Sequence, residues 1–277
     1  MSNFDDWVGR SQTFTDTMDC VRSNTLSLAL GGEGALRAGD PLPLLHHWLY
    51  FWEVRPPAGL GPDGHPATGG FLPSAALPRR MWAGGRLTFH KPLVLGASVT
   101  KTSTILSIHE KTGRTGRLVF VTVHHELDAG DGCAISEEQD LVYREPATES
   151  MPMPARAPAP KADWLECTDP DPVLLFRYSA LTMNSHRIHY DRPYAVHKEA
   201  YPGLVVHGPL QATLLIALAE RNLDTPIVGF NFRGQQPAFG GLPLYVCGGP
   251  NDGGAELWTE QGSGKNMIAT VSTEQAT

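Results

Sequence analysis

The sequence has no apolar run long enough to form a membrane-spanning helix. Crossing a bilayer takes about 18 to 20 consecutive apolar residues, and charged or turn-forming residues interrupt every such run in this chain of 277 residues. The segment Met1–Trp7 also lacks the basic stretch and the apolar run of a secretory signal peptide. We therefore expect no membrane partner and a location in the cytoplasm.

Cysteine and positive charge are scarce as well. The four cysteines are scattered and form no C-x-x-C pair, so the sequence supports neither a zinc knuckle nor a redox motif. The formal net charge is −7 at pH 7, whereas a general nucleic-acid-binding protein needs a basic face. We expect no nucleic-acid partner. A local cluster of arginine or lysine side chains would still be enough to bind an anionic ligand.

Glycine and proline, by contrast, are abundant. The 29 glycines and 23 prolines indicate many turns and favour a protein rich in strands over a helical bundle. Several of the prolines lie in the segment 146–163, among alanine, serine and threonine. Such a segment cannot build a core and is typical of an extended linker. It divides the chain into an N-terminal unit, 1–145, and a C-terminal unit, 164–277.

Apolar and alternating patterns predict a similar series of elements in both units. In the N-terminal unit we expect a helical arm over residues 1–37, a buried helix at 41–52 that begins at a proline, a long loop at 56–73, strands at 86–92, 99–108, 118–127 and 139–143, and a hairpin turn at 111–116. In the C-terminal unit we expect a helix at 210–218, strands at 227–232, 242–247, 255–260 and 267–272, and a turn at 261–265. A helix followed by hairpins in each half indicates a duplicated α+β fold. Each unit would be a curved antiparallel sheet wrapped around one helix, and the two together would form one continuous sheet with a site at the seam.

One stretch, 176–191, combines an apolar start with dense polarity. Its sequence is FRYSALTMNSHRIHYD. The first residues are typical of a short strand, and the polar part contains an amide, a guanidinium, two imidazoles and a carboxylate. Polar groups next to an apolar run are costly to bury unless they have partners or a function. We expect this stretch to carry the functional site.

The segment 179–191 (SALTMNSHRIHYD) and the later His207-Gly208-Pro209 resemble the hotdog-fold hydratases and dehydratases of the MaoC type. The resemblance is closest to the two-hotdog branch that includes type 2 hydroxyacyl-thioester dehydratases, mesaconyl-C4-CoA hydratases and itaconyl-CoA hydratases. It covers most of the chain. It implies a double hotdog fold and a hydro-lyase that adds water to an acyl thioester, or removes it, without a cofactor.

By this resemblance the catalytic histidine falls on His189. A neutral imidazole can take a proton from water or give one back near neutral pH. The catalytic aspartate of the family falls on Asn184, which cannot act as a base but can orient water through its amide. Either His189 carries the chemistry alone or a carboxylate comes from elsewhere. Asp191 is the nearest, although it is also well placed to cap a short helix, and the sequence does not place Asp63 or Glu53.

Gly208 is the second residue that the resemblance marks. A helix that begins at Gly208 aims free backbone N–H groups and the positive end of its dipole at whatever lies ahead of it. The resemblance implies that the Gly208 N–H polarises the thioester carbonyl, as an oxyanion donor would. The alternative is that glycine serves only as a spacer where the helix starts.

The candidates for substrate binding are polar residues on either side of the linker, namely Arg79, Arg80, His186, Arg187 and Asp191. A guanidinium fork suits a carboxylate or a phosphate, although each arginine could instead be exposed or paired with an internal acid. His186 and His189 are three residues apart and could share a metal ion. Because no third ligand lies nearby in the sequence, we expect no metal site.

The resemblance thus implies an enzyme that reversibly hydrates an enoyl-CoA thioester. The best specific candidate is a C5 dicarboxyl substrate, itaconyl-CoA or mesaconyl-C4-CoA, which would give citramalyl-CoA, because Arg187 could bind the second carboxylate. The alternatives are a 3-hydroxyacyl-thioester dehydratase of fatty-acid metabolism, which a long apolar tunnel would favour, and an acyl-CoA-binding hotdog protein without activity. We also expect a homo-oligomer, a dimer or larger.

Overall fold

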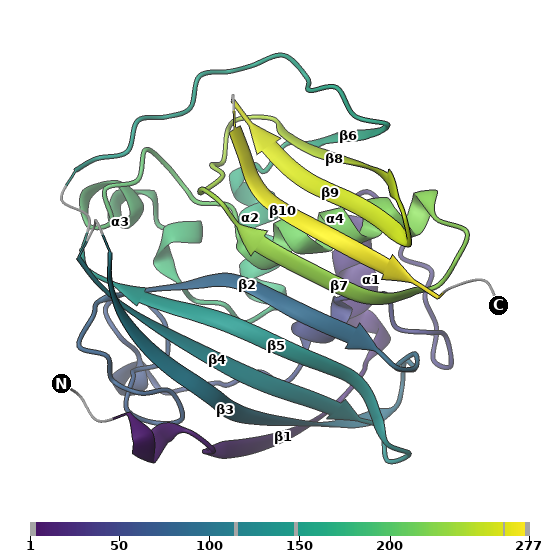
Figure 1. The fold of residues 1–277 in the computed structure, drawn as a ribbon, viewed down its shortest axis with the longest axis horizontal. Coiled ribbons are helices and arrows are strands. Elements are labelled where there is room, and N and C mark those ends of the chain that lie inside the picture. Colours follow the sequence, from purple (N-terminus) through teal and green to yellow (C-terminus); the bar gives the residue numbers. More distant parts are fainter. Residues whose placement is uncertain (1–3, 114–115, 147–148, 263, 275–277) are drawn as a thin grey trace.

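The ten strands of the described residues form one antiparallel sheet (Figure 1). The structure is a computed structural model that describes residues 4–113, 116–146, 149–262 and 264–274. The strand order is β1-β3-β4-β5-β2-β7-β10-β9-β8-β6. The two halves of the chain therefore occupy the two halves of the sheet, and they meet where β2 pairs with β7. The expectation of one continuous sheet is confirmed.

The strand order is the same in both halves. The N-terminal half contributes β1 (Ser11–Thr17), β2 (Arg79–Phe89), β3 (Ser98–Gly113), β4 (Gly116–Asp128) and β5 (Cys133–Arg144). The C-terminal half contributes β6 (Trp164–Thr168), β7 (Ile227–Gly234), β8 (Leu244–Asn251), β9 (Gly254–Gln261) and β10 (Gly264–Thr273). In each half the strands lie in the order first, third, fourth, fifth, second. This repetition is the internal duplication that the sequence indicated.

All eight strands that the sequence predicted are present, most of them longer than expected. Two further strands, β1 and β6, were not predicted, and each lies at an outer edge of the sheet. β1 occupies part of the expected helical arm, of which only α1 (Cys20–Ala29) and a short 3-10 turn, η1 (Asp5–Trp7), are helical. Three predicted segments fall partly outside the described residues. These are the turn at 111–116 (residues 114–115), the linker at 146–163 (residues 147–148) and the turn at 261–265 (residue 263).

The buried helix predicted at 41–52 is wrong. Only a 3-10 turn, η2 (His46–Leu49), forms there, flanked by Leu45 and Phe51 with φ of 64° and 62°. Residues in this left-handed region cannot continue a right-handed helix. Most apolar side chains of the run are nevertheless buried, although Trp52 at its end is exposed, so the pattern indicated core correctly and helix incorrectly.

The missing helix leaves polar groups on the inner face of the N-terminal strands. Side chains two residues apart share one face of a strand, and Val99 and Leu127 on that face belong to the main core. On the same face lie Lys101, His125 and Glu137, which line a cavity rather than pack against a helix. The N-terminal half therefore encloses open space in a position where the C-terminal half holds α4.

Helix α4 (Gly208–Asn222) confirms the helix predicted at 210–218 and packs on β7 to β10 (Figure 1). Helix α2 (Pro172–Leu181) corrects the prediction that the stretch beginning at Phe176 opens as a strand. The Asp171 carboxylate caps α2 by accepting a hydrogen bond from Leu174 N at 2.7 Å, with proline at the first turn. The remaining helical pieces are η3 (Pro57–Gly59), η4 (Arg187–His189) and α3 (Arg192–His197).

Candidate active site

A cavity of about 1410 Å³ opens between the two halves of the sheet. Its walls come from β2, β4 and β5 and the 56–73 loop on one side, and from residues 182–189, the start of α4 and β7 on the other. Five of the eight site residues predicted from the sequence line it, namely Arg80, Asn184, His186, His189 and Gly208. Arg79, Arg187 and Asp191 are not among the residues that line it.

The polar stretch reaches the cavity through a sharp reversal after α2. Met183 adopts a left-handed backbone with φ of 49°, and Asn184 N then donates to Ser179 O at 2.8 Å. The Asn184 Oδ1 accepts from His186 N at 3.0 Å, which fixes the next turn. The chain then closes η4 and presents His189. Because Oδ1 of Asn184 is used in this turn, its NH₂ group is the part of the side chain left to bind a ligand.

His189 is buried and held in one orientation. Its Nδ1–H donates to the carbonyl of Val205 at 2.8 Å, while Val205 N donates to Ile188 O at 3.0 Å. Burial lowers the pKa of His189 to about 4, although the hydrogen bond to Val205 acts in the opposite direction. The ring is therefore neutral at pH 7, and Nε2 is the unprotonated nitrogen. Such a nitrogen can accept a hydrogen bond, or a proton, from water.

A second buried imidazole lies directly against His189. The rings of His189 and His207 are stacked, with centroids 3.6 Å apart and planes inclined at 19°. His207 Nε2 is hydrogen-bonded to Ser179 Oγ at 2.8 Å. Burial, reinforced by the charges of His189 and His186, holds the pKa of His207 well below its ordinary value. The stack fixes the His189 ring from one side.

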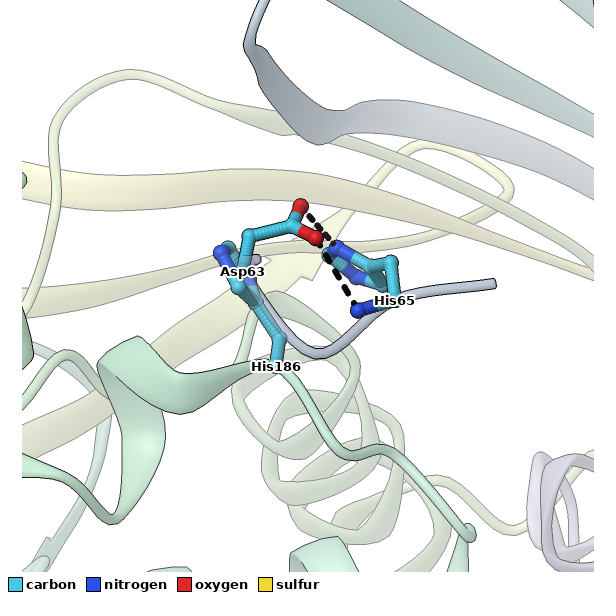
Figure 2. Close-up of side chains that lie close together, drawn as sticks. All are labelled: Asp63, His65 and His186. Atoms are coloured by element: carbon cyan, nitrogen blue, oxygen red, sulfur yellow. Dashed lines mark hydrogen bonds and ion pairs between the residues drawn. The ribbon is translucent and has the colours of Figure 1, made fainter. Parts of the chain in front are cut away.

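His186 is in contact with a pair of residues from the other half of the chain (Figure 2). The ring centroids of His186 and His65 are 4.1 Å apart, and those of His186 and His189 are 5.4 Å apart. His65 Nδ1–H donates to Asp63 Oδ2 at 2.9 Å, and His65 N donates to Asp63 Oδ1 at 3.1 Å. Burial lowers the pKa of His65 and, more strongly, that of His186. Sequence reasoning could not place Asp63, and it assigned no role to His65.

Asp63 is a carboxylate at neutral pH. Burial raises its pKa, but the hydrogen bonds and the charge of His65, together with the charge of Arg80, outweigh burial, and the net result lies below the ordinary value. Ligand atoms of Asp63, His65 and His186 all lie within 4.8 Å of one another, so this set could hold a divalent cation. The fold thus gathers a candidate set around His186 that the sequence did not indicate, and His189 is not part of it.

Gly208 occupies the first position of α4, directly after His207. The first N–H groups of a helix have no partner within it, and Gly208 lines the cavity on the same side as His189. A Cβ added at Gly208 would lie 3.8 Å from Met267 Cε, an ordinary contact, so the protein itself does not require glycine here. The absence of a side chain at Gly208 is therefore best explained by the space it leaves for a bound ligand.

The three predicted arginines differ in their partners. Arg79 is buried, with 6% of its surface exposed, and its Nε pairs with Glu199 Oε2 at 2.6 Å. Arg187 Nη2 pairs with Asp191 Oδ2 at 2.7 Å and stacks on Tyr194. Asp191 Oδ1 also accepts from Tyr194 N at 3.1 Å, so the helix-cap alternative is confirmed. Arg79 and Arg187 are thus already occupied by internal acids.

Arg80 is the predicted arginine that faces the cavity. Within the described ranges no carboxylate forms an ion pair with it, in contrast to its neighbour Arg79. Its charge lowers the pKa values of Asp63, His65 and His186, so it lies close enough to act on all three groups. An arginine in this position can bind an anionic part of a ligand.

Comparison with known proteins identifies the family. The family described as hydroxyacyl-thioester dehydratase type 2 matches residues 45–240. The chain belongs to this family. As a member of the type 2 dehydratase family it is a hydro-lyase, since dehydratases and hydratases run the same reaction in opposite directions. It is 45% identical over 267 residues to the mesaconyl-C4-CoA hydratase of Chloroflexus aurantiacus, which covers 96% of this chain and 95% of the relative.

Solved structures agree with the fold of this type 2 dehydratase family member. HtdX of Mycobacterium tuberculosis matches with a TM-score of 0.71 and 18% identity, over 96% of this chain and 100% of that one. Another protein of Mycobacterium tuberculosis, described as a double hotdog, matches with a TM-score of 0.52 and 16% identity, over 99% and 98% of the two chains. The α+β double hotdog predicted from the sequence is confirmed.

None of the helices among the described residues is long and apolar enough to cross a membrane.

Proposed function

We propose that this type 2 dehydratase family member reversibly hydrates a C5 dicarboxyl enoyl-CoA thioester, with mesaconyl-C4-CoA as the first candidate and itaconyl-CoA as the second, to give citramalyl-CoA. The similarity to the Chloroflexus hydratase over nearly the whole chain supports this reaction. The observation that carries the substrate class is Arg80, which lines the cavity without forming an ion pair among the described residues and can bind the second carboxylate of the substrate.

His189 and Gly208 act on the two ends of the reacting system. As water adds, its oxygen bonds to Cβ, the electron pair of the double bond moves toward Cα and the thioester oxygen, and a proton is delivered to Cα. The unprotonated Nε2 of His189 holds the attacking water by accepting a hydrogen bond from it. The Gly208 N–H, at the positive end of α4, stabilises the charge that develops on the thioester oxygen. Asn184 orients the water through its NH₂ group.

A 3-hydroxyacyl-thioester dehydratase acting on long acyl chains is the second candidate, and the description of the matching family favours it. Such a substrate needs an apolar tunnel. The cavity wall contributed by the N-terminal half instead contains Lys101, His125 and Glu137, which are costly neighbours for a hydrocarbon chain. This polarity supports the shorter, charged substrate.

We also propose that residues 1–145 and 164–277 are the two hotdog units and that 146–163 connects them. The repeated strand order, with β5 ending at Arg144 and β6 beginning at Trp164, supports this division.

A cytoplasmic location is supported by the four cysteines, which are all unpaired. The expected homo-oligomer stays a prediction.

The test is turnover by the purified protein with mesaconyl-C4-CoA, itaconyl-CoA and crotonyl-CoA, each followed by mass spectrometry for the gain of one water. We expect rapid hydration of at least one C5 dicarboxyl ester and slow hydration of crotonyl-CoA. The variant His189→Gln should lose about 100-fold in kcat, because misplacing the attacking water costs on the order of 10²-fold. Hydration of crotonyl-CoA alone would move the assignment to the acyl-chain dehydratases, and no hydration of any ester would refute the hydro-lyase role.

A further inference from the structure

We propose that His65, held by Asp63, is the second acid–base group of this site and carries the proton that passes from water to Cα. The inference rests on the proposed function and deepens it. Asn184 does not ionise near neutral pH, so at the cavity the polar stretch offers His186 and His189 for proton transfer. His65 lines the cavity from the N-terminal half, and Asp63, in the same loop, accepts its Nδ1–H (Figure 2).

The loop that carries this pair is fastened to the polar stretch by several hydrogen bonds. Ser185 Oγ donates to Gly64 O. Arg187 N donates to Asp63 O at 2.9 Å, and Arg187 Nη1 donates to Pro62 O at 3.1 Å. The backbone on both sides of Asp63 is therefore fixed relative to His186 and His189. This gives Arg187 a positioning role: it holds the loop, with Asp191 holding its guanidinium in turn.

The partners of the two imidazoles decide which one is the stronger base. His189 donates its Nδ1–H to a neutral backbone carbonyl, which gives little stabilisation to an imidazolium. His65 donates its Nδ1–H to the Asp63 carboxylate, whose charge stabilises the imidazolium and fixes the tautomer. Both rings present an unprotonated Nε2. His65 is thus the ring better able to keep a proton during the reaction, and Asp63 is its positioning residue.

The proton transfers balance in this arrangement. The attacking water donates one hydrogen bond to His189 Nε2 and the other to His65 Nε2. As the water oxygen bonds to Cβ, the O–H bond toward His65 breaks and His65 becomes an imidazolium paired with Asp63. The electron pair of the double bond moves to Cα, and His65 returns the same proton there. The product hydroxyl keeps the hydrogen that faces His189, and both rings end neutral as they began.

The same three residues, Asp63, His65 and His186, could instead bind a divalent cation. Two observations favour proton transfer. Asp63 Oδ2 already accepts the His65 Nδ1–H at 2.9 Å, so this carboxylate oxygen serves the imidazole rather than a metal ion. The positive charge of Arg80 acts on all three residues and opposes a second cation. Metal binding is therefore an outcome that the experiment must separate from proton transfer.

The experiment measures kcat, KM and the pH dependence of kcat/KM for His65→Gln and Asp63→Asn with the C5 ester that the wild-type protein hydrates. Matched controls are His90→Gln and Asp131→Asn, since His90 and Asp131 are exposed in the same half. We expect kcat to fall 10²–10⁴-fold for His65→Gln and at least tenfold for Asp63→Asn. Binding of the unreactive methylsuccinyl-CoA, measured by calorimetry, should stay within threefold of wild type. The controls should keep full activity.

The pH profile separates acid–base catalysis from a merely structural role. Activity rises with pH as the base loses its proton, and Asp63→Asn removes the charge that favours the protonated form of His65. The acidic limb should therefore move to lower pH in Asp63→Asn. In His65→Ala that limb should be lost, and free imidazole should restore part of the activity. A limb that stays in place, together with no rescue by imidazole, would overturn the inference.

Three further outcomes are decisive. Unchanged kcat in both variants, with the wild-type protein active, would overturn the inference and leave the proposed function standing. Loss of wild-type activity on treatment with EDTA, restored by added Zn²⁺ or Mn²⁺, would assign the three residues to a metal instead. Absence of hydration by the wild-type protein would refute the proposed function and this inference together.

Discussion

At the scale of single residues, the partners of a side chain decide what it can do. Arg79, Arg80 and Arg187 have the same guanidinium, yet Arg79 and Arg187 are each neutralised by an internal carboxylate at 2.6 to 2.7 Å. A paired guanidinium has little left to offer a ligand, and breaking a buried pair to free it is costly. Arg80 lies next to Arg79 in β2 and faces the cavity instead.

Replacing Arg80 should therefore change selectivity rather than the chemistry. We expect Arg80→Gln to raise KM for mesaconyl-C4-CoA about 10- to 100-fold, since a hydrogen bond to a charged group contributes roughly 1.5–3 kcal/mol, and to leave crotonyl-CoA kinetics nearly unchanged. Steady-state kinetics with both esters measure this. Arg86→Gln is the matched control, because Arg86 lies on the same strand but pairs with Asp140 outside the cavity. Equal effects of Arg80→Gln on the two esters would contradict the assignment.

The sequence could predict the residues that act within one short segment. His189, Asn184 and Gly208 stand in contiguous motifs, and the fold brings all three to one cavity. Asp63 and His65 lie more than a hundred residues away, in a loop whose own sequence contains no periodic signal. Only the hydrogen bonds between that loop and the polar stretch bring them to the site. Contacts of this kind are formed by tertiary packing, which a local pattern does not encode.

At the scale of elements, the 56–73 loop is a working part of the site rather than a connection. Gly64 has a φ of +92°, and a Cβ on it would lie 2.0 Å from Ser185 O. This close approach lets the loop backbone reach the polar stretch. Gly69 in the same loop also has a left-handed φ, +99°, but a Cβ there would meet no atom within 4 Å. Both glycines thus have a left-handed backbone, and they differ in that only Gly64 lies against Ser185.

This difference gives a matched pair of variants. Gly64→Ala should push the loop away from Ser185 and lower kcat at least tenfold, because His65 and Asp63 move with it. Gly69→Ala carries a similar backbone strain of about 1 kcal/mol and should leave kcat within threefold of wild type. Kinetics and thermal unfolding of both variants measure activity and stability side by side. Equal activities of the two variants would show that the loop does not position catalytic groups.

Element types were harder to predict from the sequence than element positions. The run at 41–52 is buried as expected, yet Leu45 and Phe51 adopt left-handed backbones that stop a helix. The apolar start of the polar stretch belongs to helix α2, because Asp171 and Pro172 begin a helix upstream of it. A short apolar run fits a buried helix, strand or turn equally well. In α2 the capping residues, rather than the apolar ones, indicate that the element is a helix.

At the scale of the whole molecule, the two halves of the sheet share a strand order and differ in what covers their inner faces. The C-terminal strands carry the long helix α4, whereas the run at 41–52 in the N-terminal half forms the short turn His46–Leu49. The space left open is lined by ionisable groups that pair with one another, such as His47 Nε2 with Glu137 Oε2 at 3.1 Å. The duplicated fold thus builds one cavity from two unequal halves.

The molecule also buries many histidines in the neutral form, and this makes the fold sensitive to acid. Burial lowers the pKa of His46 and of His189 to about 4 and also depresses that of His207, whereas an unfolded histidine titrates near 6.5. The unfolded chain therefore binds more protons than the folded chain between about pH 6.5 and pH 4. Stability is fully present above that window and is lost as the pH falls through it.

Urea unfolding between pH 7.5 and pH 4.5 should accordingly show a free energy of unfolding that falls with decreasing pH. His46 lies beneath α1, where its Nδ1 is hydrogen-bonded to Ser23 Oγ at 2.7 Å, far from any proposed role in catalysis. Replacing it by glutamine should reduce the slope by up to one proton, about 1.4 kcal/mol per pH unit, whatever it does to stability at pH 7.5. The exposed His90, replaced in the same way, serves as the matched control for the substitution itself. An equal slope in His46→Gln and wild type would mean that His46 titrates alike in the folded and unfolded chains. Other groups would then cause the loss of stability in acid.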